Sequence, residues 1–452
     1  MKLYLFNSLT NQNDYLTLEP QQTVSIYLCG PTVYDHIHIG NLRPIIVFDV
    51  LHRFLLHCGY GVKYVHNLTD IDDKIIQKAQ KEKKSELIVT QHYIKVYFQN
   101  LYNYNIIKPT FTPKVTDYVS QIQKFIDNLI KKKHAYRQEN NILFRTKNNS
   151  EYGQLSKQKA EKLQSGETRQ NSREIIKIDK ETFQDFVLWK NTNQGTNWYS
   201  PWGHGRPGWH TECVVFIQEL FGKTIDIHGG GQDLLFPHHE NERIQYLAAN
   251  NQELSKIWLH IGHLHWDQEK MSKSLGNVIL AKHFYQKYGP NVLRYLFLNS
   301  HYNQVINFNE KLLQQAQDYA QKTKNLLKRL KLYFYWKKIN IDKQKNNKNN
   351  LLYQETIQAL GDNLNTIKVI NYLDEIICRL NKELDEKKAT GIIKSLAAIL
   401  YFILDILGFK FELVSYDWQI CYLLDKWQKL RQNKQFSEAD QIRKQLQEKD
   451  II

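Results

Sequence analysis

Two short segments carry the residues of this sequence best suited to chemistry on a phosphate. The first is HIHIGN, residues 36–41. It follows an apolar run over residues 24–29 that predicts a buried strand, and an apolar helical pattern begins after Pro44. A strand, a turn and a helix N-terminus together favour anion binding, because free backbone N–H groups and the helix dipole point at the ligand. The residues predicted to meet a nucleotide there are His36, His38, Gly40 and Asn41. By itself, a histidine pair at a turn is equally typical of a structural site.

The second segment is KMSKS, residues 270–274, in a hydrophilic stretch typical of a loop. The ammonium groups of Lys270 and Lys273 could close over a polyphosphate and neutralise the charge that grows during attack on an α-phosphate. An isolated lysine pair would more often be a solvated loop. The ordered pair of segments resembles class I aminoacyl-tRNA synthetases, which activate an amino acid with ATP and pass it to tRNA.

Four residues of metal-ligand type are spread over the sequence: Cys29, Cys213, His238 and Glu242. Two thiols, an imidazole and a carboxylate suit zinc. His238 and Glu242 are four residues apart, so on a helix they would share one face. There is no CxxC pair, and two isolated cysteines are typical of buried thiols. The spacing alone therefore leaves a zinc site and a pair of buried thiols both open.

Longer blocks around these residues are similar to the cysteinyl-tRNA synthetase family. They are CGPTVYDHIHIGN, NLTDIDDK, YGQLS, DFVLWK, SPWGHGRPGWHTEC, GGGQDLLFPHHENE and HYNQVINF. The resemblance implies that the four ligand-type residues hold one zinc ion at the bottom of the amino-acid pocket, with the cysteine substrate as a further ligand. The implied cysteine pocket consists of Cys29, Thr69, Trp209 and His238. The implied ATP site, with Mg²⁺ accompanying ATP, includes Asp233 together with His36, His38, Lys270 and Lys273.

Zinc gives such an enzyme a way to choose its substrate. Cysteine and serine differ by sulfur for oxygen, and an apolar pocket rejects so close an analogue poorly. Zinc binds thiolate well, whereas a serine hydroxyl is a much poorer ligand at neutral pH. The resemblance therefore implies a metal that selects the thiol, no protein nucleophile and no separate editing domain.

The composition is consistent with a polyanionic partner such as tRNA. The chain has 452 residues and a formal net charge of +15, from 61 Lys and Arg against 46 Asp and Glu. Codon usage rich in A and T would also enrich lysine. Five cysteines favour a reducing compartment, and no apolar run is long enough to span a membrane. We expect a monomer in the cytoplasm, with an organelle-encoded protein of the plastid stroma as the alternative.

The pattern along the chain predicts an α/β fold with a Rossmann-like parallel sheet, followed by an all-α C-terminal region. Residues 1–115 alternate strands and helices and form the first half of the catalytic domain, which residues 206–265 complete. Residues 116–205 are more polar, with helix-forming repeats, and predict a connective insertion between the halves. Residues 266–308 contain KMSKS and a connecting segment. Residues 309–452 predict a helical region that binds tRNA and its anticodon.

The end of the chain, residues 426–446, predicts a helix, a turn and a second helix. Ser437 is a candidate N-cap of the second helix, and Trp418 and Trp427 are predicted to lie in the core. Basic residues are also dense over 309–338, where RNA contacts and a solvated helix face would explain them equally well. The resemblance to the family's anticodon-binding end implies two further RNA contacts, Arg431 and Arg443.

Two other functions fit part of the sequence. A related ligase activates cysteine in the same way but couples it to an amino sugar, and it would share every zinc and ATP residue. That ligase lacks an anticodon-binding domain, so residues 351–452 argue against it. The other alternative is a non-catalytic RNA-binding protein derived from a synthetase. Intact His38, Lys273 and metal-ligand residues argue against that alternative, since loss of activity would have left them free to change.

Overall fold

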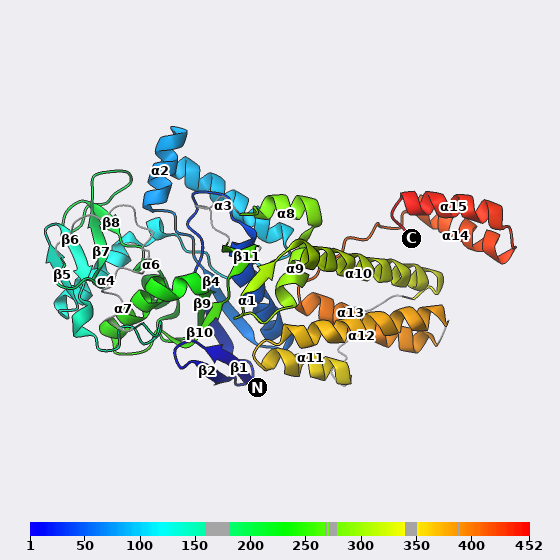
Figure 1. Ribbon diagram of the computed structural model, residues 1–452, viewed down its shortest axis with the longest axis horizontal. Coiled ribbons are helices and arrows are strands. Elements are labelled where there is room, and N and C mark those ends of the chain that lie inside the picture. The colour runs from blue at the N-terminus through cyan, green and yellow to red at the C-terminus, as the bar shows by residue number, and fades with distance from the viewer. Residues whose placement is uncertain (159–179, 267–268, 271–277, 340–349, 387–388) are drawn as a thin grey trace. The chain divides into compact units, whose positions relative to one another are not determined.

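The computed structural model describes residues 1–158, 180–266, 269–270, 278–339, 350–386 and 389–452. Within these residues the chain forms two compact units (Figure 1). The first unit consists of Met1–Lys287, His301–Phe308 and Gly361–Leu364. The second unit consists of Tyr288–Ser300, Asn309–Leu360 and Asn365–Ile452.

A parallel sheet of four strands forms the centre of the first unit, in the order β10-β9-β3-β4. The strands are β3 (Thr23–Leu28), β4 (Gly61–His66), β9 (Ile225–Gly231) and β10 (Ser255–Ile261). The inner strands β3 and β9 and the edge strand β10 are buried almost throughout, as is typical of parallel sheets covered on both faces. The predicted strand over residues 225–231 is confirmed, and the one over residues 24–29 is confirmed with bounds one residue earlier.

Helices connect the strands of this sheet in a βαβ arrangement. The helix α1 (Ile39–His57) joins β3 to β4 and packs against β4, β9 and β10, and α7 (Glu240–Asn250) joins β9 to β10. The remaining helices that precede the second unit are α2 (Asp73–Glu82), α3 (Glu86–Asn103), α4 (Val119–Lys131), α6 (Glu212–Phe221) and α8 (Ala281–Tyr288). The parallel sheet with its connecting helices confirms the predicted α/β class.

The helix α1 begins at Ile39, six residues earlier than the sequence predicted. Its N-cap is His38, whose backbone N–H donates a hydrogen bond to Oδ1 of Asn41 at 3.1 Å. Pro44 lies inside the helix, where its fixed φ suits helical backbone although it lacks an N–H donor. A helix start after Pro44 was therefore wrong, and the end of HIHIGN forms the first helical turn.

A second, antiparallel sheet has three strands in the segment predicted as the insertion, residues 116–205, and a fourth strand that begins at its last residue. Its order is β5-β6-β7-β8, with β5 (Ala135–Gln138), β6 (Asn141–Phe144), β7 (Phe186–Asn191) and β8 (Gly205–Pro207). Among the described residues of this segment, helix-forming repeats were expected, but apart from α4 the regular structure is mainly short strands. Strands this short show no clear alternation, and β6 is buried at every residue. The antiparallel strands and α4 share one buried cluster with Tyr27 and Val65 of the parallel sheet. Most of the lysine-rich stretch over residues 157–180 lies outside the described residues.

Two small sheets complete the first unit. The hairpin of β1 (Lys2–Asn7) and β2 (Gln12–Thr17) forms one of them. The other has the order β12-β11-β13, with β11 (Leu264–Trp266), β12 (Glu269–Lys270) and β13 (Ile306–Phe308). The first lysine of KMSKS ends β12, and the rest of that motif lies outside the described residues.

The second unit is helical, which confirms the predicted all-α C-terminal region. Its helices are α9 (Pro290–Leu298), α10 (Glu310–Trp336), α11 (Leu351–Gly361), α12 (Thr366–Asp385), α13 (Thr390–Ile406), α14 (Trp418–Gln432) and α15 (Phe436–Glu448). No helix among the described residues is both long and apolar enough to cross a lipid bilayer.

The helices α14 and α15 form the predicted helical pair, but two details of the prediction were wrong. Trp427 is buried and packs on Trp336 of α10, with ring centroids 5.6 Å apart. Trp418, in contrast, is 75% exposed. Ser437 does not cap α15, because the helix begins one residue earlier, at Phe436, with Gln435 in the N-cap position.

Candidate active site

Four residues from four segments meet at the carboxyl end of the parallel sheet. Cys29 follows β3 directly, and Cys213 lies in the first turn of α6. His238 lies in the turn after β9, and Glu242 lies in the first turn of α7. Their ligand atoms all lie within 4.8 Å of one another. The carboxyl ends of parallel strands share one edge, so the structure brings together all four residues predicted to bind zinc.

Three of four separations between these atoms are close to those expected around a tetrahedral zinc ion, and the fourth is shorter. The sulfurs of Cys29 and Cys213 are 3.7 Å apart, and zinc bond lengths give about 3.8 Å for two thiolates. Cys29 Sγ lies 3.4 Å from Glu242 Oε1, and Cys213 Sγ lies 3.7 Å from His238 Nε2. Both should be about 3.6 Å around zinc. His238 Nε2 and Glu242 Oε1 are hydrogen-bonded at 2.8 Å, and zinc would separate them to about 3.4 Å.

The charges of this buried cluster are balanced by a proton. Burial alone would raise the pKa of Glu242, but the attraction of His238 and His228 outweighs burial and holds this pKa well below its usual range. Burial would lower the pKa of His238, but Glu242 and Cys213 together outweigh burial and raise this pKa to about 10. A proton between His238 and Glu242 therefore supplies the positive charge at the centre of the cluster. A metal ion would displace it.

Two histidines that the sequence analysis did not single out lie beside Glu242 and Cys29. His228 Nε2 is 2.7 Å from the second carboxylate oxygen of Glu242, and His239 Nε2 is 3.3 Å from Cys29 Sγ. With Cys29 and Glu242 they form a second possible donor set. The set with two sulfurs suits zinc better, because zinc readily takes thiolate ligands and the second set offers only one. His228 is then a partner that orients the Glu242 carboxylate, and His260 holds His239 at 2.8 Å.

The predicted cysteine pocket includes the ring of His238. Trp209 stacks on that ring, with centroids 4.3 Å apart and planes at 22°, and is 42% exposed. His210 Nδ1 lies 3.1 Å from His238 Nδ1, which leaves Nε2 of His238 facing Cys213. Burial, together with the neighbouring His238, lowers the pKa of His210 to about 3. The neutral ring of His210 can therefore accept the hydrogen bond that fixes His238.

Thr69, the other predicted pocket residue, is buried beside Glu212. Its Oγ1 donates a hydrogen bond to Glu212 Oε1 at 2.5 Å. Burial raises the pKa of Glu212 well above its usual range. Glu212 directly precedes Cys213, so this hydrogen bond ties the segment after β4 to the helix that carries a candidate metal ligand.

A cluster of ion pairs, named here the Asp73 clasp, also joins the segment after β4 to the segment before α6. The clasp consists of Asp73 at the start of α2, Arg206 on β8 and Lys190 on β7. The Asp73 carboxylate pairs with Arg206, whose side chain is 6% exposed, and lies 3.0 Å from Lys190 Nζ. Asp73 is four residues after Thr69, and Arg206 is three residues before Trp209. The clasp therefore links the two segments that supply the predicted cysteine pocket.

The residues of HIHIGN follow β3 and so lie at the same end of the sheet. His38 caps α1, and a Cβ at Gly40 would lie 2.9 Å from Nδ1 of His38. Gly40 is therefore needed for the ring of His38 to hold this position. His36 is half-buried and packs edge to face on Tyr93, with ring centroids 5.4 Å apart. This turn carries the predicted contacts to the α-phosphate.

The other predicted ATP residues are Asp233 and the two lysines of KMSKS. Asp233 is exposed in the turn that follows β9, whose carboxyl end lies at the same edge of the sheet. Lys270 ends β12 and pairs through its backbone with His265. The side chain of Lys270 and the whole of Lys273 lie outside the described residues.

Similarity to known proteins shows the family. Residues 16–318 match the family described as tRNA synthetases class I (C) catalytic domain. A cysteine–tRNA ligase of Malacoplasma penetrans is 39% identical over 454 residues, and one of Mycoplasma mycoides subsp. mycoides SC is 42% identical over 453 residues. Both alignments cover 100% of each chain. This chain belongs to the cysteine–tRNA ligase family.

Solved structures of other class I synthetases share the fold. A Mycobacterium tuberculosis methionyl-tRNA synthetase in complex with methionyl-adenylate superposes with a TM-score of 0.58 at 15% identity, over 89% of this chain and 91% of the other. A leucyl-tRNA synthetase of Agrobacterium radiobacter K84, in a ternary complex, superposes with a TM-score of 0.59 at 12% identity, over 87% and 84% of the two chains. At these identities the likeness concerns the fold alone.

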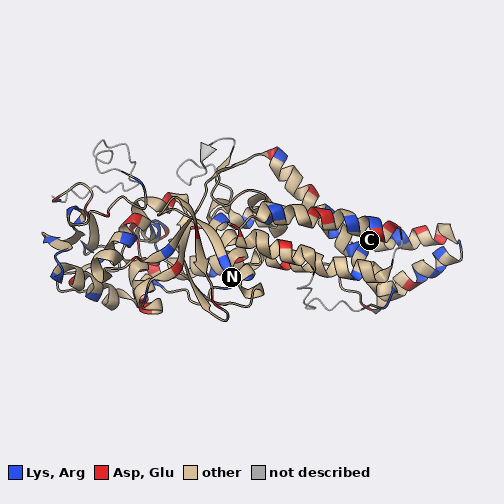
Figure 2. Ribbon diagram, turned by 90° about the horizontal axis from the view of Figure 1, so that it is seen from below, with Lys and Arg blue, Asp and Glu red and all other residues tan. Residues whose placement is uncertain are grey.

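The two C-terminal arginines predicted from the family to meet tRNA have different surroundings. The Arg431 guanidinium lies over the ring of Trp427, 5.1 Å from its centroid, whereas Arg443 is exposed on α15. Several basic residues of α10 form ion pairs within the second unit. Figure 2 shows Lys and Arg interspersed with Asp and Glu along the helices. Lys324 and Lys328, for example, both pair with Asp450, at 2.7 and 2.5 Å. The positive charge of α10 therefore serves in part to hold the end of the chain.

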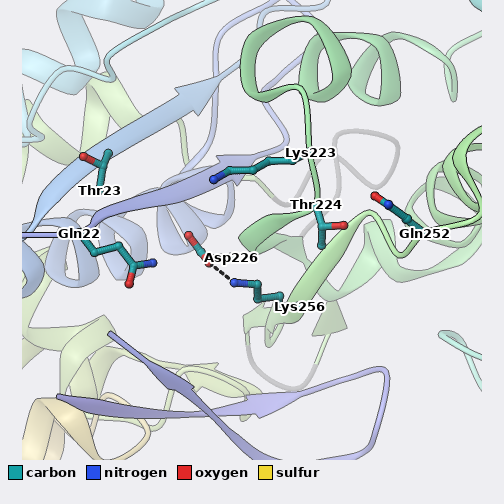
Figure 3. A pocket seen from close by; sticks show the side chains of 7 residues that line it. All are labelled: Gln22, Thr23, Lys223, Thr224, Asp226, Gln252 and Lys256. Atoms are coloured by element: carbon teal, nitrogen blue, oxygen red, sulfur yellow. Dashed lines mark hydrogen bonds and ion pairs between the residues drawn. The ribbon is translucent and has the colours of Figure 1, made fainter. Parts of the chain in front are cut away.

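A hollow of about 510 Å³, lined by the polar residues shown in Figure 3, lies at the amino ends of β3, β9 and β10, whereas the candidate metal cluster lies at the carboxyl end of the sheet. It is lined by Gln22, Thr23, Lys223, Thr224, Asp226, Gln252 and Lys256. Asp226 pairs with Lys256 at 2.9 Å and accepts hydrogen bonds from the backbone N–H and the hydroxyl of Ser25, at 2.9 and 2.7 Å. Each carboxylate oxygen is thus satisfied, and we assign no chemistry to this hollow.

Proposed function

We propose that this protein activates L-cysteine with ATP to cysteinyl-adenylate and transfers the cysteinyl group to the 3′ end of tRNA(Cys). The observation that carries the proposal is the convergence of two thiols, an imidazole and a carboxylate at the carboxyl end of the sheet, next to the HIHIGN turn. Full-length similarity to cysteine–tRNA ligases supports the same reaction. No observation favours an amino-sugar acceptor or a non-catalytic role.

The activation step needs charge stabilisation and positioning rather than a protein nucleophile. His36 and His38 donate hydrogen bonds to the charge that develops on the α-phosphate, with the N-terminus of α1 behind them. Lys270 and Lys273 hold the pyrophosphate that leaves, and Asp233 contacts the ribose and adenine. The cysteine carboxylate attacks in line, and the terminal ribose hydroxyl of tRNA then attacks the adenylate.

Selection of cysteine falls to Cys29, Cys213, His238 and Glu242, which would hold one zinc ion per chain. When bound, zinc would ligate the substrate thiolate, a contact that serine cannot match. Trp209 covers His238 at the exposed side of the pocket, and Thr69 forms part of its wall. His210 contacts Nδ1 of His238, and His228 contacts Oε2 of Glu242. These two contacts keep His238 and Glu242 oriented.

The same proposal includes the partners and setting of the reaction. Mg²⁺ accompanies ATP, Arg431 and Arg443 contact the tRNA, and the protein acts as a monomer. Bacterial relatives support the cytoplasm as its compartment; the plastid stroma is the alternative for an organelle-encoded chain. In domain terms, residues 1–115 and 206–265 bind ATP and cysteine. Residues 116–205 are an insertion, 266–308 connect the regions, and 309–452 bind tRNA.

Charging of tRNA(Cys) transcript with labelled cysteine tests the proposal. We expect cysteine-dependent pyrophosphate exchange, charging of the transcript and rejection of serine at equal concentration. An amino sugar offered as acceptor should receive no label. Transfer to the amino sugar without charging of tRNA would overturn the proposed acceptor, and absence of exchange would overturn activation itself.

Lys273→Ala tests the second ATP motif. The lost contact is made mainly in the transition state, so kcat of pyrophosphate exchange should fall by about 10² to 10³ with little change in KM for cysteine. An unchanged kcat would mean that Lys273 is only a solvated loop residue.

A further inference from the structure

The outer face of α14 carries aromatic and basic residues that the packing of the second unit does not use. Trp418 and Tyr422 are 75% and 60% exposed, and Lys426 and Lys429 are also exposed. Successive spacings of four, four and three residues place these side chains within an arc of about 80° on the helix. They form a continuous row, here named the α14 stripe, about 16 Å long.

The opposite side of α14 is the side that stabilises the fold. Its buried residues, which pack against α15 and the end of α10, are Ile420, Leu424, Trp427 and Leu430. Because this apolar side already anchors the helix, the exposed tryptophan and tyrosine are not needed for packing. Large aromatic side chains without a packing role are typical of binding surfaces.

The charges along the α14 stripe favour a polyanion. Neither Lys426 nor Lys429 forms an ion pair within the part of the chain that the structure describes. The one acidic side chain at the edge of the stripe, Asp425, accepts a hydrogen bond from Tyr335 Oη of α10 at 3.0 Å. Two lysines therefore face solvent, and the neighbouring carboxylate of α14, Asp425, is hydrogen-bonded to Tyr335.

We propose that the α14 stripe binds unpaired nucleotides of a tRNA loop. Trp418 and Tyr422 offer flat faces on which bases stack, and Lys426 and Lys429 offer charges for the adjoining phosphates. Stacking requires bases that are free of a duplex, so the ligand is a loop rather than a paired stem. The inference rests on the proposed function, and it adds a surface to that function rather than restating the predicted contacts. Arg431 lies on another side of α14, against Trp427.

Binding of the full-length protein to tRNA(Cys) transcript, and to an oligonucleotide of its anticodon stem and loop, tests the proposal. Trp418→Ala should weaken both affinities by about tenfold, while Trp418→Phe should change them by less than about threefold, because stacking needs a ring. Tyr199→Ala is the matched control, since Tyr199 is equally exposed, at 75%, but lies in the first unit. It should leave both affinities unchanged.

The contribution of Lys426 and Lys429 is tested by the salt dependence of tRNA binding. The double variant Lys426→Gln, Lys429→Gln should reduce the slope of log affinity against log salt concentration by about two, one for each lost phosphate contact. Cysteine-dependent pyrophosphate exchange should stay at the wild-type rate in every stripe variant, and circular dichroism should show unchanged helix content. Exchange thus reports on the proposed function independently of the stripe.

Three outcomes would overturn the inference. The first is unchanged tRNA affinity in Trp418→Ala. The second is an affinity that falls equally in Trp418→Ala and Trp418→Phe, which would indicate a shape contact rather than stacking. The third is self-association of the wild-type protein, seen by sedimentation, that Trp418→Ala abolishes while tRNA affinity stays constant. That result would make the stripe an interface between two copies.

Discussion

The two edges of the parallel sheet are both polar, yet only one is built for chemistry. At the amino edge, one oxygen of Asp226 accepts hydrogen bonds from Ser25, and the other pairs with Lys256, as Figure 3 shows. At the carboxyl edge, Glu242 is fully buried among two thiols and several histidines, and its ion-pair partners in the described residues are His228 and His238 rather than a lysine or arginine. Asp226 at the amino edge therefore has all its polar partners within the protein. At the carboxyl edge, the charge of Glu242 is met by a proton shared with His238, which a metal ion could displace.

The difference follows from how well each edge of the sheet excludes water from its charged side chains. The Lys256 side chain is 55% exposed, so water shares in solvating the Asp226 pair. His238 and Glu242 are 3% and 0% exposed, and their charges must be met by groups inside the protein. A buried carboxylate with soft ligands around it gains most from a divalent cation, because the cation replaces a proton and also bonds the thiols. Burial without a fixed countercharge is thus what distinguishes the candidate active site from a polar hollow.

Removing a thiol from the carboxyl edge should have the largest effect. Cys213→Ser keeps the size of the side chain but replaces a good zinc ligand with a poor one. We expect one zinc per chain in the wild type, loss of zinc in the variant, and a rise of at least about 100-fold in KM for cysteine. KM for ATP should change much less. Metal analysis with pyrophosphate exchange measures both, and wild-type activity in protein free of zinc would refute the assignment.

Removing the second partner of Glu242 should have a smaller effect at the same edge. His228→Gln leaves all four candidate ligands but removes the imidazole that is 2.7 Å from the free oxygen of Glu242. Partners of this kind contribute about 10- to 100-fold to metal affinity. Competition with a chelator should show zinc lost at lower chelator concentration than in the wild type. Equal zinc retention in both proteins would mean that His228 serves packing on Trp258 instead.

Releasing the Asp73 clasp should have a smaller effect still, because it acts on the pocket only through backbone. Asp73→Asn leaves Arg206, which is largely buried, without its carboxylate partner. Because Asp73 is 45% exposed, solvent screens the pair, and we expect a loss of about 1 kcal/mol, or about fivefold in KM for cysteine. Zinc content and KM for ATP should match the wild type. A change in KM for ATP of the same size would show that the clasp supports the whole catalytic sheet.

The sequence predicted those parts of the molecule that show a regular hydrophobic period or a known family motif. The strand over residues 225–231 and the helical pair near the C-terminus follow from periodicity, and Cys29, Cys213, His238 and Glu242 came from family motifs that the fold then gathers. His228 was missed because it lies within a run that looks like an ordinary buried strand. A histidine buried in an apolar strand could have been the signal. Trp418 was assigned to the core because hydrophobicity does not reveal which side of an isolated helix is covered.

The smallest effect on activity should come from the amino edge. Asp226→Asn removes the ion pair with Lys256 and weakens the hydrogen bonds from Ser25, at a distance from every predicted substrate contact. KM and kcat should equal the wild-type values, while the free energy of unfolding at pH 7 should fall by about 1–2 kcal/mol. Asparagine retains the size of the side chain, so a kinetic change would have to come from the charge.

The pH dependence of this loss identifies its cause. Burial alone would raise the pKa of Asp226, but the Ser25 hydrogen bonds and Lys256 outweigh burial and hold the pKa below its usual range. A carboxylate whose pKa is depressed in the folded state stabilises the protein above its unfolded pKa of about 4, and that contribution disappears as pH falls through the folded value. Urea unfolding of wild type and variant should therefore differ most near pH 7 and converge below pH 4. A difference independent of pH would assign the loss to packing. Altered cysteine kinetics would mean that the two edges of the sheet are coupled.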